Sequence, residues 1–119
     1  MSRIASPRLL METIHGITVA SFADAELLTE DVIHEVGEQL QELAGGLGQA
    51  DVLLNFRGVR LMSSTMLGVL FKFARRIAAA GGRLKLCGIA PDLLAAFKIT
   101  RFDRLFEIHD EESTALDSF

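Results

Sequence analysis

The stretch DVLLNFRGVRLMSSTMLGVLFKF, residues 51–73, decides the fold of this chain. Its first six residues form a short, nearly continuous apolar run, as in a central strand that is covered on both faces. Its last part begins an amphipathic helix that we predict from about Thr65 to Ala80. Three hydroxyl side chains, Ser63, Ser64 and Thr65, lie between the two elements. Any functional interpretation has to explain these hydroxyls.

Patterns on either side of this stretch extend the prediction along the chain. The runs LLMETI and ITVASF flank His15 and Gly16, which predicts an N-terminal β-hairpin. Apolar residues at helical spacing predict a first helix over 29–44, stopped by GGLGQ. Farther along, RLKLCGI predicts a strand, Pro91 begins a third helix, RLFEI predicts a short strand, and DEESTALDSF predicts a last helix.

The order of these elements indicates an α/β fold. Strands that alternate with helices imply crossover connections, so we expect a central mixed, mostly parallel sheet of four to five strands, with an N-terminal β-hairpin and about four helices. A chain of 119 residues suits one domain, 1–119. We expect the core to contain Leu53, Leu54, Leu67, Leu70, Leu84 and Leu86.

Composition limits the class of protein. Half of the residues are hydrophobic, but no apolar run approaches the roughly 20 residues that span a bilayer. The N-terminal stretch MSRIASPRLLMETIHG has an apolar segment too short and too interrupted for a secretory signal. We therefore expect a cytoplasmic protein that does not insert into a membrane.

Charge and cysteine content point to a protein partner. The net charge of −4 argues against a nucleic-acid binder, which needs a basic face to displace phosphate counterions. Cys87 is the only cysteine, so no internal disulfide can form. Because it lies in the apolar run LKLCGI, we expect it to be a small buried hydrophobe without a redox role.

The sequence offers few candidate catalytic or metal-binding residues. His15, His34 and His109 lie far apart in sequence, and their spacing does not suggest a metal site. Ser64 follows a strand and opens a helix, as a nucleophile elbow does, but the flanking glycines of that motif are missing and His109 has no obvious partner acid. We expect no catalytic residues, no metal and no cofactor.

The hydroxyls have a simple structural explanation. One of Ser63, Ser64 and Thr65 can cap the second helix by accepting a hydrogen bond from a free N–H group, an effect of roughly 1 kcal/mol. The same helix end would also favour a phosphate group. On the helix itself, Met66, Val69 and Phe73 widen the apolar arc to roughly 200°, more than packing on a sheet requires. Either loops cover this edge, or a partner docks there.

The residues from about Asp51 to Leu116 resemble the STAS domain family, and within it the bacterial anti-sigma factor antagonists. The similar segments are NFRGV, SSTMLGVL, AAAGGRLKLCGIAPD and ITRFDRLFEIHDEESTAL. The resemblance implies a STAS fold and a protein-binding switch. Such proteins dock on an anti-sigma factor, often itself a serine kinase, and so release a sigma factor. Phosphorylation of the first serine of the motif abolishes docking, and a serine phosphatase restores it.

Residue by residue, the resemblance makes Ser64 the phosphoacceptor, with Ser63 as the alternative. The acid that usually precedes the phosphoserine is Ser63 here, and the glycine two places after it is Met66. We expect the following residues to contact the partner: Ser63, Ser64, Thr65, Met66, Val69 and Phe73.

Three functions stay open at this point. The first is the phosphorylation-switched antagonist, whose partners are an anti-sigma factor that acts as a serine kinase and a serine phosphatase. The second is an unphosphorylated scaffold or regulatory subunit of a stress-signalling or transport complex. The third, a small-molecule enzyme, is disfavoured because no catalytic constellation is evident. Weak self-association is compatible with each of them.

Overall fold

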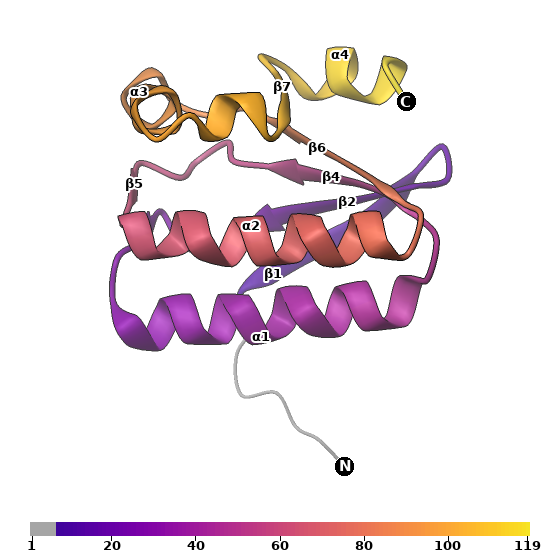
Figure 1. The fold of residues 1–119 in the computed structure, drawn as a ribbon, viewed down its shortest axis with the longest axis horizontal. Helices are drawn as coiled ribbons and strands as arrows, with labels where there is room; N and C mark the ends of the chain where they lie inside the picture. The colour runs from indigo at the N-terminus through magenta and orange to yellow at the C-terminus, as the bar shows by residue number, and fades with distance from the viewer. Residues whose placement is uncertain (1–6) are drawn as a thin grey trace.

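The computed structural model describes residues 7–119 and contains a five-stranded sheet with the strand order β1-β2-β4-β6-β7 (Figure 1). β1 and β2 are antiparallel, and every other neighbouring pair in this sheet is parallel. The expected mixed, mostly parallel sheet that begins with a hairpin is therefore confirmed. The strands are β1 (Leu9–Ile14), β2 (Ile17–Phe22), β4 (Asp51–Asn55), β6 (Arg83–Cys87) and β7 (Glu107–His109).

The turn between β1 and β2 shows why the sequence forms a hairpin here. His15 and Gly16 are its two central residues, with φ angles of 53° and 80°. A two-residue turn with positive φ at both positions matches the right-handed twist of the strands, and glycine adopts such angles without strain. Leu9 consequently pairs with Phe22 at the far end of the ladder.

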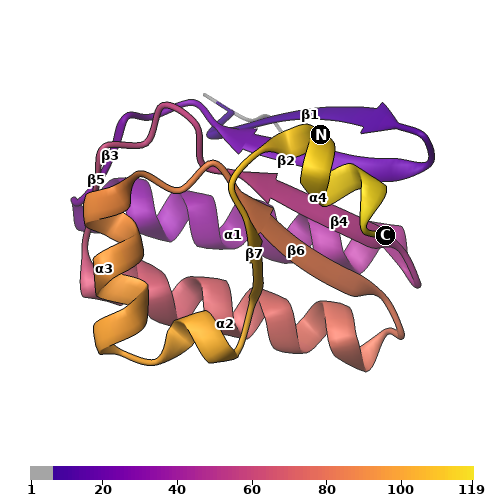
Figure 2. The same cartoon turned by 90° about the horizontal axis from the view of Figure 1, so that it is seen from above.

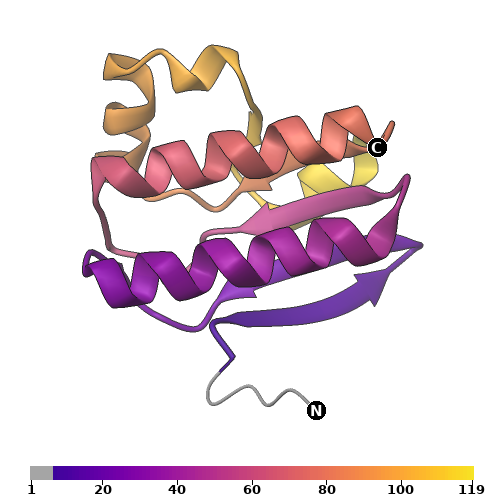
Figure 3. The ribbon, with the colours of Figure 1, turned by 60° about the horizontal axis from the view of Figure 1, so that its bottom comes forward.

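Helices cover both faces of the sheet. α1 (Glu30–Leu47) and α2 (Ser64–Ala79) lie side by side on one face, and the short α4 (Glu112–Asp117) lies on the other (Figures 1 and 3). α3 (Pro91–Ile99) lies near the N-terminal end of α2, beyond the edge of the sheet (Figure 2). This end of the molecule carries the hydroxyl residues.

The core follows the alternation of the central strands. Val52, Leu54 and Leu86 face α1 and α2, where they join the main hydrophobic cluster. Leu53 and Cys87 point to the opposite face and pack with Ala115 of α4. Of the six leucines expected in the core, five are buried and Leu84 is half-buried against the main cluster.

The first helix is longer than expected. α1 continues through Gly45 and Gly46 to Leu47 and ends at Gly48, whose φ is 64°. Leu47 packs against the main cluster, and this contact favours one more helical turn despite the low helix propensity of glycine. Thr29, expected as the first helical residue, is the N-cap, and its hydroxyl accepts a 3.4 Å hydrogen bond from Val32 N.

Near the C-terminus, the expected strand over residues 104–108 begins later. A turn of 3-10 helix, Phe102–Arg104, comes first, and β7 follows at Glu107–His109. Three phenylalanines pack in series here, because the Phe102 and Phe97 rings each lie within 6.2 Å of the Phe106 ring. This packing shortens the strand.

No helix within the described residues is long and apolar enough to cross a membrane. Part of the N-terminal stretch that was considered as a secretory signal, residues 1–6, lies outside the described residues.

Candidate functional site

A two-stranded parallel pair, β3 (Glu26–Leu27) and β5 (Leu61–Met62), positions the hydroxyl residues. The pair continues into Ser63, whose backbone N–H donates to Leu27 O at 3.1 Å. α2 begins at the next residue, so Ser64 is its first helical residue. Sequence patterns did not predict this pair, because two-residue strands are too short to show alternation.

Ser63 occupies the N-cap position, but its side chain does not cap the helix. Its backbone carbonyl accepts from Met66 N at 3.1 Å, whereas its hydroxyl makes no capping hydrogen bond. Within residues 7–119, the buried Ser63 Oγ has no hydrogen-bond partner at all. The expectation that a side chain of this motif caps α2 is therefore wrong for Ser63, and a buried hydroxyl without a partner is destabilising.

Ser64 and Thr65 are exposed at the N-terminal end of α2. The first turn of this helix carries no acidic residue. The partial positive charge of the helix end is therefore not balanced by a carboxylate within the helix, and a negative group there would be stabilised. Chemically, Ser64 is an accessible hydroxyl in a setting that favours an anion.

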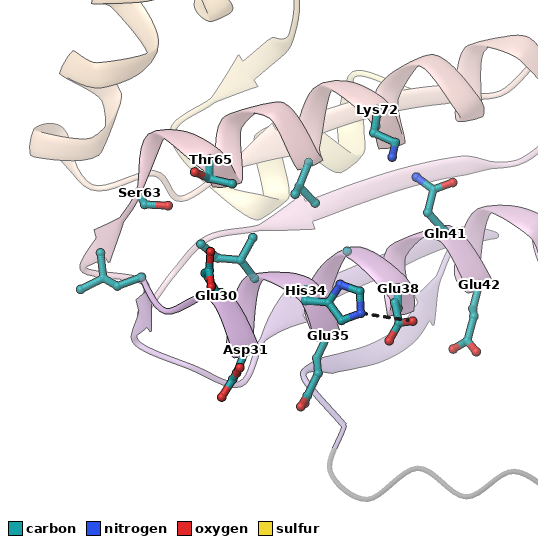
Figure 4. Close-up of a pocket in the computed structure, with 14 residues that line it drawn as sticks. Glu30, Asp31, His34, Glu35, Glu38, Gln41, Glu42, Ser63, Thr65 and Lys72 are labelled. Atoms are coloured by element: carbon teal, nitrogen blue, oxygen red, sulfur yellow. Dashed lines mark ion pairs between the residues drawn. The ribbon is translucent and has the colours of Figure 1, made fainter.

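Two hollows meet at these residues. Ser64 lines the smaller one, of about 150 Å³, together with Leu67 of α2 and Ile99 and Thr100 at the end of α3. Thr65 lines a larger groove of about 1000 Å³ between α1 and α2 (Figure 4). Ser63 lines both. The hydroxyls therefore face two different surroundings.

Exposed apolar side chains lie near the three hydroxyl residues. Ile99, which is 82% exposed, borders the smaller hollow. Leu28 borders the groove on the other side, and Leu61 lies in β5, two residues before Ser63. Apolar side chains that gather around a polar centre are typical of protein-docking surfaces.

The apolar edge of α2 corrects part of the expected partner surface. Met66 and Phe73 have no exposed surface and belong to the main core cluster, so a partner cannot contact them in this conformation. Val69 is half-buried, and a Cβ atom added at Gly37 of α1 would lie 3.5 Å from Val69 Cγ1. The wide apolar arc is explained by α1, which packs along α2. Ser63, Ser64, Thr65 and Val69 still line the two hollows.

Sequence reasoning missed the acidic side of the groove. Acidic residues of α1 at positions 31, 35, 38 and 42 line it, together with Glu30. Their spacing of four, three and four residues places them along one side of a helix, and this periodicity is visible in the sequence.

His109, expected to lack a partner acid, has one. Its Nε2 lies 2.7 Å from Glu107 Oε2 and 3.2 Å from Ser118 Oγ. Both contacts use the same ring nitrogen, whereas a catalytic triad needs the acid and the nucleophile on opposite nitrogens. Among residues 7–119, no group of three or more His, Cys, Asp or Glu side chains is placed so that it could hold a metal ion.

Comparison with known proteins identifies related structures. The STAS domain family model matches residues 11–115. An anti-sigma-factor antagonist (STAS) domain protein from Planctomyces limnophilus has the same fold, with a TM-score of 0.81, 20% identity and coverage of 92% of this chain and 96% of that chain.

Two further structures show how widely the fold is used. The phosphorylated form of SpoIIAA, a cell fate determinant from Bacillus, is 18% identical over 92% of this chain and 97% of its own, with a TM-score of 0.67. A sulfate transporter family protein from Wolinella succinogenes is 17% identical over 90% of this chain and 87% of its own, with a TM-score of 0.73. At these identities the similarities show a shared fold.

Proposed function

Since this chain belongs to the STAS domain family, we propose that it is an anti-sigma factor antagonist whose docking is switched by phosphorylation of Ser64. Its partner is an anti-sigma factor that also acts as a serine kinase, and a serine phosphatase reverses the modification. One observation carries the proposal: Ser64 is exposed as the first residue of α2, beside a hollow that the exposed side chain of Ile99 borders.

The surroundings of Ser64 support a charge-driven switch. A phosphate on Ser64 adds roughly two negative charges at a helix end that stabilises anions, so the protein stays folded. A partner that covers Ile99 and the hollow would have to remove water from that charge. Docking is therefore lost while the fold is kept.

Burial favours Ser64 over Ser63 as the acceptor. A kinase must place the attacking hydroxyl in line with the phosphate it transfers, and the buried Ser63 Oγ cannot reach that position without rearrangement. Ser64 needs no such change because it is exposed. The usual acid before the phosphoserine is absent, which removes one negative charge that would oppose the added phosphate.

Affinity capture from the native cell tests the proposal. Wild-type protein, Ser64→Ala and Ser64→Asp serve as baits, and mass spectrometry identifies both the captured proteins and any phosphate on residues 63–65. We expect Ser64→Asp to bind the captured anti-sigma factor at least about ten-fold more weakly, a loss of ~1.4 kcal/mol or more. Ser64→Ala should bind and resist inactivation by kinase and ATP.

Ser113→Asp is the matched control, because Ser113 is exposed on α4 across the sheet from α1 and α2. It adds the same charge and should bind as wild type does. If Ser64→Asp also binds like wild type, and neither Ser63 nor Ser64 is modified, the switch is wrong. An unphosphorylated scaffold or subunit of a stress-signalling or transport complex then replaces it.

A further inference from the structure

The groove between α1 and α2 has an acidic side that the serine switch does not use. Five acidic residues of α1 line it, whereas α2 contributes one lysine, Lys72. Figure 4 shows the carboxylates of Asp31, Glu35 and Glu42 on the side of α1 that points away from α2. Asp31 and Glu42 lie eleven residues apart on the helix, which corresponds to a distance of roughly 16 Å, or three helical turns. The acidic side is therefore as long as a short docked helix.

Few of these carboxylates are neutralised within the chain. Arg8 Nε binds Glu35 at 2.9 Å, and His34 Nε2 lies 3.5 Å from Glu38. Across residues 7–119, no lysine or arginine forms an ion pair with Glu30, Asp31 or Glu42. Negative charge therefore remains available along the groove.

The groove combines this charge with apolar surface and an unsatisfied hydroxyl. Apolar residues also line it, namely Leu28, Ile33 of α1 and Val69 of α2. At the same end as Leu28, Figure 4 shows Ser63 with its hydroxyl directed toward the space between the helices, and this oxygen has no partner among the described residues. Because this oxygen is buried, a segment lying in the groove could supply the missing hydrogen bond only after the Ser63 side chain rotates toward it.

We propose that this groove binds an amphipathic helical segment of a partner protein that carries lysine or arginine at three- and four-residue spacing. Carboxylates spaced four, three and four residues apart on α1 oppose basic residues of the same spacing on a helix lying alongside. An acidic segment or a phosphate backbone would be repelled. Ser64 does not line the groove, so this binding does not require its phosphorylation.

A charge-swap experiment with defined peptides tests the proposal. The probe is an amphipathic peptide of about 18 residues, five helical turns, with lysines at this spacing and leucine and alanine on the adjoining face. The matched peptide has glutamate at each lysine. NMR of the labelled protein follows the backbone amides of Ile33, Gly37 and Val69, which line the groove. We expect only the lysine peptide to shift them, saturably and more weakly at high salt.

Glu38→Lys combined with Glu42→Lys should bind the lysine peptide at least ten-fold more weakly and should now bind the glutamate peptide. The control, Glu12→Lys combined with Asp110→Lys, changes the net charge equally at exposed positions outside the groove. It should bind as wild type does. Equal loss in both double variants, or peptide shifts outside the groove, would show nonspecific attraction and overturn the proposal, as would no binding by wild type.

The serine switch is tested separately with the same probe. Ser64→Asp should bind the lysine peptide as wild type does, even where it no longer binds the anti-sigma partner. A failure of the switch therefore leaves this result intact, and a failure of the peptide to bind leaves the switch untouched.

Discussion

Lys85 Nζ, on a side chain that is only 6% exposed, lies 2.9 Å from Glu107 Oε2. The same ammonium donates to Ser118 O at 2.7 Å and contacts Ser118 Oγ at 2.8 Å. It also lies 4.6 Å from the centre of the Phe119 ring. One charged group thus connects the inner strand β6 to the edge strand β7 and to the residues after α4. These contacts compensate for its removal from water.

This connection predicts a stability that depends on pH. Hydrogen bonds from Lys85 and then His109 lower the pKa of Glu107 from 4.5 to about 2. A lowered pKa in the folded protein means that Glu107 stabilises the fold fully above about pH 4.5 and that this contribution is lost as the pH falls to about 2. Because Glu107 is half exposed, we expect the contribution to be about 1 kcal/mol or less.

Denaturant unfolding of wild type and Glu107→Gln over this pH range checks the prediction. The difference between their free energies of unfolding should be largest near neutral pH and should shrink toward pH 2. Glu12→Gln, at an exposed position on β1, controls for loss of a carboxylate. If the difference in free energy of unfolding between wild type and Glu107→Gln stayed constant down to pH 2, the Lys85–Glu107 contact would not be its source.

The thiol of Cys87 should react slowly. Cys87 has no exposed surface, and burial raises its pKa to about 12, with a smaller effect from the charge of Glu112. Because the thiolate is the reactive form, both effects suppress alkylation. We expect a bulky maleimide to label the native protein at least a hundred-fold more slowly than the protein unfolded in urea, an order-of-magnitude estimate from the thiol pKa. Comparable rates would contradict the burial of Cys87.

Phe71 and Phe73 of α2 differ in burial, although they lie only two residues apart. Phe73 has no exposed surface, whereas Phe71 is half-buried, and its ring lies tilted beside that of Phe102, with 6.1 Å between the ring centres. Truncation of a fully buried phenylalanine to alanine costs ~3–5 kcal/mol, so Phe73→Ala should lower the free energy of unfolding by that amount. Phe71→Ala should cost clearly less. If Phe73→Ala changed the free energy of unfolding only slightly, Phe73 would not be a core residue and could contact a partner.

Most of the fold could be predicted because its signals are local. The hairpin was predicted from His15–Gly16, and the parallel strands from short apolar runs between helical patterns. The predicted bounds of helices and strands are wrong where tertiary contacts outweigh local preference. α1 passes through Gly45 and Gly46 because Leu47 reaches the core, and β7 begins late because three phenylalanines pack before it. The β3–β5 pair left no pattern, since each strand has two residues.

The candidate site was predicted less completely. The sequence located Ser63, Ser64 and Thr65 at a helix start, and the structure places that start at Ser64. Sequence alone could not show that α1 covers Met66 and Phe73, because that depends on how the two helices pack. Nor could it show that Ile99, far away in the chain, borders the same hollow as Ser64.

The unsatisfied hydroxyl of Ser63 makes a prediction opposite to the one expected for a helix cap. Replacing a serine cap by alanine usually costs about 1 kcal/mol, because a hydrogen bond to a free N–H group is lost. Ser63 Oγ makes no such bond and is buried, so its removal also removes a desolvated polar atom. We therefore expect Ser63→Ala to leave the melting temperature unchanged or to raise it.

Thr29→Ala is the matched comparison, because Thr29 occupies the same position before α1 and its hydroxyl accepts a hydrogen bond from Val32 N. This variant should lose about 0.5–1 kcal/mol of unfolding free energy, toward the lower end because the bond is long at 3.4 Å. Thermal and denaturant unfolding of both variants measure the difference directly. If Ser63→Ala loses as much stability as Thr29→Ala, the Ser63 hydroxyl caps α2 in solution, and it would not be free to bond a segment lying in the groove.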